Sequence, residues 1–507
     1  MMNQMNQHTR ALNHTRRDGF VLLAILVFIL LLSMVTLSLL FRSQGEETAV
    51  NATAGSEQAW SAAMSGVEDA MRVAAAATPG STDWQDDPVL FRQRLVYDDG
   101  ADQWYFTVFS TAGSDSLVEF RYGLSDEASR LNLNHLGNAD LTKIPQITAA
   151  LADSIRQFIG APPPTDQSTL AIIAPTPPQD SALATPASPD VTDLPDLPTN
   201  DPALATPHGS LATLDELLLA PGISWPLLHG QTASLVAVTQ TNEDAVETSI
   251  PSDTSQTKRD HGLEQYFTVV SYDPNLNNAG TARANLNDPA SSLPDVQLPA
   301  GFSNYVAALR SSNQQLAHPA EALEATTTFK NDKGVEVEVA SGITKDELPL
   351  LLDYFTAEKA ARHDGLVNIN TASAAVLASL PGIDLALAET IVSTRTGLDP
   401  SRLTTIGWLY QERLVDAARF KLIAPALTAR SFQFRFDVIG YGLPSGRYRV
   451  LEVIIDVAGG ERHVTYLRDI TRLGMPFNLK PDTNETITGE SPVRRSRNAY
   501  FPKYRHG

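Results

Sequence analysis

Residues 20–41 read FVLLAILVFILLLSMVTLSLLF, a stretch without a charged residue, a glycine or a proline. As a helix rising 1.5 Å per residue it would be about 33 Å long, enough to cross a hydrocarbon core of about 30 Å. A secretory signal has a shorter apolar region, and no small-residue cleavage site follows this one. The stretch therefore predicts a transmembrane helix.

The residues before this stretch predict its orientation. Arg10, Arg16 and Arg17 precede it, and basic flanks stay on the cytoplasmic side. We expect a single-pass membrane protein with a cytoplasmic amino terminus and most of the chain exported. A plain signal anchor would give the same pattern.

The helix is expected to continue beyond the membrane as a spine. Residues 58–77 (QAWSAAMSGVEDAMRVAAAA) are rich in alanine, and Thr78-Pro79-Gly80 ends the pattern. Five larger apolar residues fall roughly along one helical face: Trp60, Met64, Val67, Met71 and Val73.

Strand-like segments occur in two groups that lie far apart in the chain. Aromatic and β-branched runs cover 103–110 and 117–124, and three more cover 432–440, 448–457 and 463–470. Because each group is short for a sheet of its own, we expect both to pair into one antiparallel sheet behind the helix. The expected fold class is α+β, with a long amino-terminal helix packed on an antiparallel sheet that is interrupted by a large, mostly helical insertion.

The expected insertion contains an internal repeat. Residues 131–159 align with 367–395 at a spacing of 236, so that Asn132 and Asn134 match Asn368 and Asn370. Each copy predicts an extended Asn pair, a helix, a tight turn and a second helix. A partial third signal covers 214–224 (LDELLLAPGIS).

Composition narrows the classes of function. The 507 residues have a formal net charge of −20 and no cysteine, which excludes disulfides, Cys-ligated metal sites and thiol nucleophiles. So acidic a chain is a poor general binder of nucleic acid. Much of the excess lies in 157–257, which has no Lys or Arg, and the Pro-rich part of it, 161–210, predicts a mobile linker.

These patterns divide the chain into ten segments. In order, they are a leader (1–19), a transmembrane helix (20–41), a spine continuation (42–78), a first α/β part (79–130), a first helix-turn-helix repeat (131–160), an acidic linker (161–210), a helical or mixed insertion (211–365), a helix-hairpin-helix (366–428), a β-meander (429–475) and a flexible tail (476–507).

The second repeat has the pattern of a helix-hairpin-helix, with Pro381, Gly382 and Ile383 in the hairpin. In DNA-binding hairpins, backbone N–H groups and nearby lysines approach a phosphate. Here Asp384 follows where a second glycine is usual, Gln146 replaces the hairpin glycine of the first copy, and only Arg395 and Arg402 lie nearby. These residues favour a packing module over a DNA reader.

The leader resembles a type IV prepilin signal, because Arg16-Arg17-Asp18-Gly19 runs directly into Phe20. The resemblance implies that a membrane peptidase cuts between Gly19 and Phe20 and methylates the new terminus. Most such proteins have Glu at the fifth mature position, and this chain has Ala24. A carboxylate in lipid needs a partner, so its absence fits a subunit with no neighbour ahead of it.

A longer resemblance is to the general secretion pathway protein K family of type II secretion systems. It rests on the leader without Glu, on Asp126-Glu127 followed by Asn132 and Asn134, and on the closing strands. It implies a minor pseudopilin at the pseudopilus tip that initiates assembly and supports protein export. The implied partners are minor pseudopilins I and J, the major pseudopilin and the prepilin peptidase, with no nucleic acid.

Two other functions fit the sequence. One is a membrane-anchored DNA receptor that uses the hairpin, and the other is a membrane-tethered scaffold whose leader is not processed.

No catalytic motif emerges from the sequence, and we expect no enzyme activity. Asp126 and Glu127 are the nearest approach to a carboxylate pair, but neighbours in a strand point to opposite faces, so a cap or turn role is expected.

Some members of the protein K family bind calcium in the helical domain. The linker acids Asp190, Asp193, Asp196 and Asp201 lack an EF-hand pattern, so we assign no metal residues and expect no cofactor.

Overall fold

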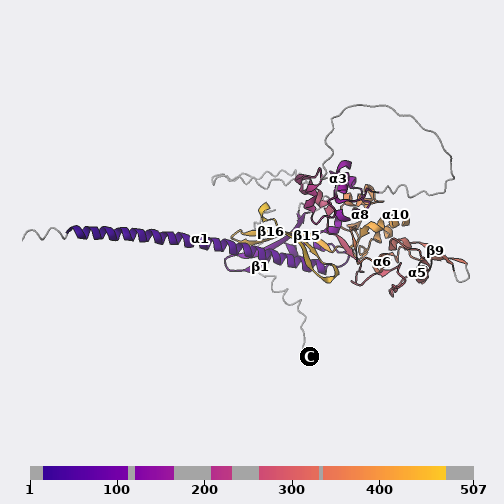
Figure 1. The fold of residues 1–507 in the computed structure, drawn as a ribbon. Helices are drawn as coiled ribbons and strands as arrows, with labels where there is room; N and C mark the ends of the chain where they lie inside the picture. Colours follow the sequence, from indigo (N-terminus) through magenta and orange to yellow (C-terminus); the bar gives the residue numbers. More distant parts are fainter. Residues whose placement is uncertain (1–14, 112–119, 165–206, 231–261, 331–334, 475–507) are drawn as a thin grey trace, which may run out of the picture.

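A long amino-terminal helix leads into a body of one antiparallel sheet and two helical units (Figure 1). The computed structural model describes residues 15–111, 120–164, 207–230, 262–330 and 335–474. The start of the expected leader, most of the expected linker with its four aspartates, and the expected tail lie outside the described residues. The described chain is a mixture of helix and sheet compatible with the α+β class.

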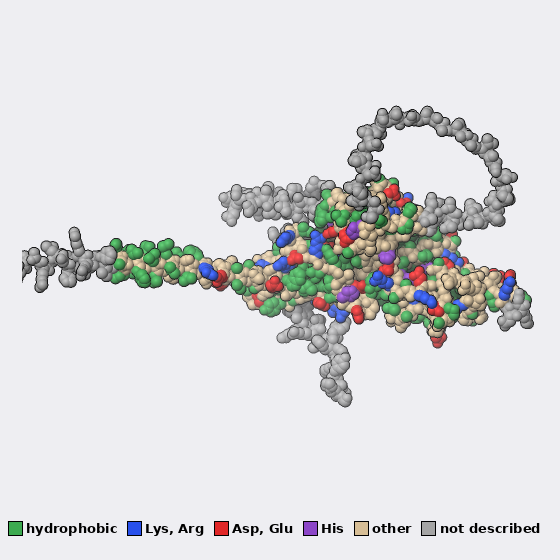
Figure 2. All heavy atoms as spheres, viewed as in Figure 1, with side chains coloured by type: hydrophobic (Ala, Val, Ile, Leu, Met, Phe, Trp, Pro, Cys, Tyr) green, Lys and Arg blue, Asp and Glu red, His purple; other side chains and the backbone are tan. Residues whose placement is uncertain are grey.

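Helix α1 (Thr15–Ala76) is continuous over 62 residues, so the predicted transmembrane and spine segments are one helix. Its apolar half is exposed on every side, as the green spheres of Figure 2 show. Within this half, the Ser33 hydroxyl donates to the Ile29 carbonyl at 2.8 Å and the Thr36 hydroxyl to the Leu32 carbonyl at 2.7 Å. These bonds satisfy both hydroxyl groups without water.

The second half of α1 packs on the sheet through small residues. Gly440 shows how close the helix comes, because a Cβ there would lie 2.1 Å from the Ala59 carbonyl oxygen. All five predicted apolar residues contact the core under the sheet: Val67 and Met71 are buried in it, and Trp60, Met64 and Val73 pack against it partly buried. The fully buried face also contains small residues that were not predicted, namely Gly55, Ala59, Ala62, Ala63, Gly66, Ala70 and Ala74.

The main sheet joins the two ends of the body, which confirms the predicted pairing of the two strand groups. Its path is β1-β2-β15-β16-β17, with every neighbouring pair antiparallel, and β3 and β4 at the side. The strands are β1 (Arg94–Asp98), β2 (Gln103–Thr111), β3 (Phe120–Arg121), β4 (Ser125–Asp126), β15 (Gln433–Leu443), β16 (Tyr448–Asp456) and β17 (His463–Asp469).

Alternation along β15 directs Phe434, Phe436 and Val438 into the core shared with α1. Two details differ from expectation. β1 was not predicted, although it reads RLVYD, and the expected strand over 117–124 shortens to β3 in its described part. Helix α2 (Pro88–Phe91) precedes β1, and the Asp87 carboxylate caps it.

Two helical units of related construction follow the first sheet strands. The first unit (residues 127–160, 207–230 and 262–271) contains β5 (Leu131–Asn132), α3 (Ala149–Ile159), α4 (Trp225–His229) and β6 (Phe267–Thr268). The second unit (residues 366–431) contains β13 (Val367–Asn368), α7 (Ala374–Ala378), α8 (Leu385–Arg395), α9 (Trp408–Gln411), α10 (Ala417–Ile423) and β14 (Leu427–Thr428).

The repeat seen in the sequence is present in the backbone. α3 and α8 begin and end at matching positions, and β5 and β13 each pair with a later parallel strand. The first unit differs in one respect, since the first expected helix of its repeat is replaced by short 3₁₀ turns. Residues 138–142 (NADLT), which match α7 of the second copy (AAVLA), contain Asn, Asp and Thr, which form helices less readily than alanine.

The segment between the two units, residues 272–365, is a mixture of short elements rather than a helical domain. Its elements are β7 (Tyr272–Pro274), β8 (Ala284–Asn285), α5 (Phe302–Ser311), β9 (Thr326–Lys330), β10 (Glu336–Ala340), α6 (Leu348–Tyr354), β11 (Phe355–Thr356) and β12 (Arg362–Asp364). β9 and β10 form a hairpin at one end of the body (Figure 1).

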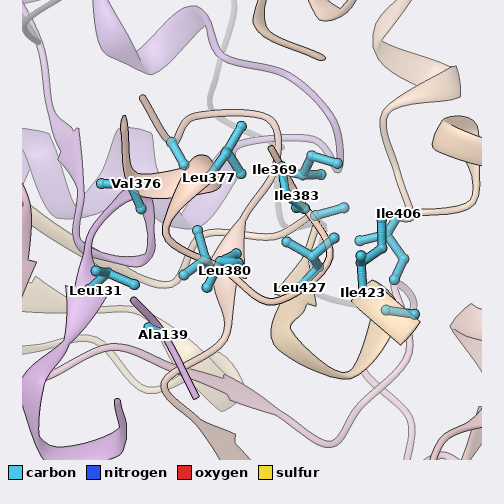
Figure 3. Close-up of a cluster of buried hydrophobic side chains, with 14 of the residues drawn as sticks. Leu131, Ala139, Ile369, Val376, Leu377, Leu380, Ile383, Ile406, Ile423 and Leu427 are labelled. Carbon is cyan, nitrogen blue, oxygen red and sulfur yellow. The ribbon is translucent and has the colours of Figure 1, made fainter. Parts of the chain in front are cut away.

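One continuous hydrophobic core runs through both units and the segment between them. Figure 3 shows Leu131 and Ala139 of the first unit beside Leu380 of the second. The backbone N–H of Asp140 also donates to the Ser379 carbonyl at 2.6 Å. The two units therefore pack directly on one another.

Candidate functional site

Asp126 lies at the entry to the helical units, where the sheet passes into the first 3₁₀ turn. One carboxylate oxygen accepts from the Ala128 N–H at 2.9 Å and caps that turn. The other accepts from Asn368 Nδ2 at 2.9 Å, Thr371 Oγ1 at 2.6 Å and Ser431 Oγ at 2.7 Å. Burial raises the pKa of Asp126 to about 6, although these hydrogen bonds oppose the rise. Asp126 thus ties the sheet to the second unit.

Glu127 ties the first unit to the same sheet. Its Oε1 accepts from Arg130 Nη1 at 2.7 Å and from Arg435 Nε of β15 at 2.8 Å, and the Thr268 hydroxyl donates to Oε2. Burial alone would raise the pKa of Glu127, but Arg435 and Arg130 outweigh it and the pKa is lowered. Asp126 and Glu127 therefore face different partners.

The paired asparagines clamp each unit. The Asn132 side chain accepts from the Asn134 N–H at 3.0 Å, and Asn134 Nδ2 donates to the Leu211 and Val269 carbonyls at 2.9 and 3.3 Å. Each carboxamide uses both of its groups, because Asn132 Nδ2 also donates to the Ser271 carbonyl at 3.0 Å and Asn134 Oδ1 accepts from the Leu211 N–H at 2.7 Å.

The second unit has the same clamp. Asn368 accepts from the Asn370 N–H at 2.9 Å, and Asn370 Nδ2 donates to the Leu403 and Ala429 carbonyls at 2.8 and 3.0 Å. In both units the second asparagine joins three chain segments.

The hairpin between α7 and α8 holds Pro381, Gly382 and Ile383. Gly382 has φ of 79° and Ile383 is buried. A Cβ on Gly382 would also lie 2.9 Å from the Ile423 side chain, so glycine is required here by conformation and by packing. In the first unit Gln146 occupies the matching position with φ of 68°.

The amino terminus of α8 is capped by the protein itself. Asp384 Oδ1 accepts from the Leu387 N–H at 2.8 Å, and Oδ2 pairs with Arg419 Nη2 at 2.7 Å. The Leu387 N–H and the Arg419 guanidinium lower the pKa of Asp384. Arg419 Nε also donates to the Gly382 carbonyl at 2.9 Å. A carboxylate therefore stands where a hairpin of the DNA-binding type would receive a phosphate.

The two arginines expected near the hairpin make contacts within the fold. Arg395 Nη1 donates to the Ile369 and Ala372 carbonyls at 2.8 and 2.7 Å. Arg402 pairs with Glu412 at 2.6 Å.

The residues expected for leader processing are far from the hairpin. Gly19 and Phe20 belong to the first turns of α1, and Ala24 is exposed one turn later. The start of α1 projects away from the body that contains α8 (Figure 1). Among the described residues, α1 is the single helix long and apolar enough to cross a membrane.

The sequence did not reveal the later strand of each unit, which lies at β6 in the first unit and at β14 in the second. Thr268 donates to Glu127 in the first unit, and Thr428 donates to Asp273 beside the second. Additional chain segments interrupt the first unit but not the second, so the number of residues between β5 and Thr268 differs from that between β13 and Thr428. A search for repeats at one constant spacing therefore does not find these two threonines. The shared pattern L-x-T-[LI] at 211–214 and 403–406 was the available signal.

Comparison with known proteins identifies one part of this site. A family model described as a helix-hairpin-helix motif matches residues 363–402, which include β13, α7, the hairpin and α8. No curated protein matches the chain. The chain therefore carries a helix-hairpin-helix motif in its second unit.

Proposed function

We propose that this protein is a minor pseudopilin of the general secretion pathway protein K family, placed at the tip of a type II secretion pseudopilus. The observation that carries the proposal is the architecture of α1. Its first half is apolar and exposed, and its second half packs through small residues on an antiparallel sheet. The strands of that sheet come from both ends of the body, around the helical units, as in a pilin-like fold with an insertion.

The role is structural rather than catalytic. The apolar half of α1 would lie in the inner membrane with the amino terminus in the cytoplasm, because basic residues precede it. The body would lie in the periplasm and initiate assembly with minor pseudopilins I and J, ahead of the major pseudopilin. Prepilin peptidase would cut between Gly19 and Phe20 and methylate Phe20.

Ala24 supports the tip position. The side chain of residue 24 is exposed on an apolar helix, where a carboxylate would need a partner from a neighbouring subunit. A subunit at the tip has no neighbour ahead of it, so alanine at this position loses no interaction between subunits.

Mass spectrometry of the full chain purified from membranes tests the proposal. The expected amino terminus is N-methyl-Phe20, and a Gly19→Val variant should keep the leader. A wild-type chain that retains Met1 would contradict the proposal. Co-purification with other pilin-like subunits, retained in the wild type and lost in Gly19→Val, would support the assembly role.

The second candidate is a membrane-anchored DNA receptor, which the helix-hairpin-helix match favours. The capped amino terminus of α8 argues against it, because Asp384 would repel a phosphate and Arg419 is already paired. A mobility-shift assay with the full chain in detergent should show no DNA binding at physiological salt. Micromolar, salt-sensitive binding by the wild type would favour the receptor. Asp384→Gly is the informative comparison because it removes the repelling carboxylate.

A further inference from the structure

A cavity lies between the second unit and the segment before it. Its volume is about 420 Å³, within the range of small-molecule sites. Its walls are partly apolar, from Leu352, Phe355, Ile406 and Leu427. No function proposed above uses it.

Arg283 is the unusual residue of this cavity. Its Nε donates to the Asp353 carbonyl at 3.0 Å. Among the described residues, no ion pair or hydrogen bond engages its two terminal nitrogens, and neither is fully buried without a partner. Burial and the nearby Arg430 lower the pKa of Arg283 to about 10, so the side chain is still a cation at neutral pH.

The Asp273 and Asp353 carboxylates favour the charged form of Arg283, but burial and Arg430 outweigh them, and among the described residues neither carboxylate forms an ion pair with Arg283. Asp273 also lines the cavity, but it is paired with Arg430 and accepts from the Thr428 hydroxyl. A partly buried cation that lacks an ion-pair partner is costly to a fold. Such a residue is readily explained by an anion that enters from outside.

His318 supplies a second donor to the same cavity. Its Nδ1 accepts from the Ala320 N–H at 3.1 Å, which places the proton of the neutral ring on Nε2. Burial, with His363 and Arg283 nearby, lowers the pKa of His318 to about 3, so the ring is neutral. No hydrogen bond engages Nε2 among the described residues.

We propose that this cavity binds a carboxylate carried on an apolar stem, with Arg283 as the charged donor, His318 Nε2–H as the neutral donor and the apolar walls around the stem. One guanidinium matches the single charge of a carboxylate, and its planar fork can bind both oxygens. A dianionic phosphate would be left undercompensated beside Asp273. The carboxylate could belong to a small organic acid or to the carboxy terminus of a peptide, which share this chemistry.

Calorimetric titration of the full chain in detergent tests the site with paired probes. Hexanoate is compared with hexanamide, and N-acetyl-Leu-Leu with its carboxy-terminal amide, because each pair differs only in the charge. At least one carboxylate should bind at least tenfold more tightly than its amide, and the better of the two identifies the source. Equal binding within a pair, no binding by either carboxylate, or tighter binding of inorganic phosphate would overturn the proposal.

Variants locate the binding on Arg283. Arg283→Met keeps the stem and removes the charge, so the preference for the carboxylate should disappear, and Arg283→Lys should retain part of it. Arg462→Met, at an exposed position before β17, should leave binding unchanged. A structural arginine would lower the melting temperature when replaced by Met, whereas an unpaired ligand-binding arginine should leave it unchanged or raise it. Unchanged carboxylate binding by Arg283→Met would overturn the assignment.

Discussion

At the residue scale, Glu127 is a carboxylate whose replacement should strongly destabilise the fold. It is fully buried, and two arginines and one hydroxyl occupy its oxygens. Glu127→Gln would leave Arg130 and Arg435 without their shared counter-charge, which should lower the free energy of unfolding by about 3–5 kcal/mol. Urea unfolding followed by tryptophan fluorescence measures the change. Glu338→Gln, at an exposed position of β10, should stay within about 0.5 kcal/mol of wild type, and a similarly small effect at Glu127 would contradict the prediction.

Asp126 should make stability depend on pH in a definite direction. Burial raises its pKa from 3.8 to about 6 on folding, so the folded protein holds this proton more tightly than the unfolded chain. The contribution is fully present below about pH 4 and is lost as the pH rises through 6, a change of about 3 kcal/mol. Asp126→Asn carries no titrating proton, and its unfolding free energy should fall less between pH 4 and 6. Parallel pH profiles for the two proteins would refute this prediction.

Some residue-level features were readable from the sequence and others were not. The repeated Asn-x-Asn pairs marked matching positions, because clamping several segments requires a group that donates and accepts. Gln146 could not be recognised as a left-handed residue, since that conformation is typical of glycine and only the fold shows it. Arg435 was equally hidden, because it meets Glu127 only after the sheet has joined the two ends of the body.

At the element scale, the close contact of α1 with β15 depends on Gly440 of β15, which has no side chain. A Cβ at Gly440 would lie 2.1 Å from the Ala59 carbonyl and 2.4 Å from the Ala63 nitrogen. Backbone atoms cannot move aside as a side chain can, so Gly440→Ala should push the helix from the sheet and cost about 1–3 kcal/mol. Gly45→Ala lies in the same helix with nothing within 4 Å, and it should stabilise the helix by up to about 1 kcal/mol. Thermal unfolding of both variants checks the difference in sign, and equal melting temperatures would contradict it.

The elements of the fold differ in how far the sequence could predict them, because their sequence patterns differ in strength. Strands β15, β16 and β17 are rich in aromatic and β-branched residues, and the prediction located each of them to within a few residues. The prediction for α1 found the larger residues that pack on the sheet but not the buried alanines and glycines, because these carry little hydrophobic signal although they allow the closest approach. The segment between the units escaped prediction, since its strands of two to five residues are too short for a periodic pattern.

At the scale of the whole molecule, the two halves of α1 should be separable. The large apolar residues between Leu22 and Phe41 are exposed, whereas the face of α1 that packs on the sheet begins at Gly55 and Ala59. A chain beginning at residue 42 should therefore leave the membrane fraction and keep the circular dichroism of the folded body without detergent. Fractionation followed by spectroscopy tests both expectations. Aggregation of the shortened chain, or loss of its near-ultraviolet signal, would show that the apolar half supports the fold.

The proposed tip position makes a final prediction at Ala24, one turn inside the apolar segment. A carboxylate within the apolar segment is unfavourable unless a partner neutralises it; the cost is about 2.5–3.5 kcal/mol at the helix centre and smaller at a position one turn from its end. In the body of a filament a neighbouring amino terminus would supply that partner, but a tip subunit has no subunit ahead of it. Ala24→Glu should therefore reduce export by the secretion system and the recovery of the protein with its pilin-like partners, whereas Ala24→Leu should match the wild type in both assays. If Ala24→Glu instead assembles as well as the wild type or better, and is found along the filament, the subunit has a neighbour on that side and does not occupy the tip.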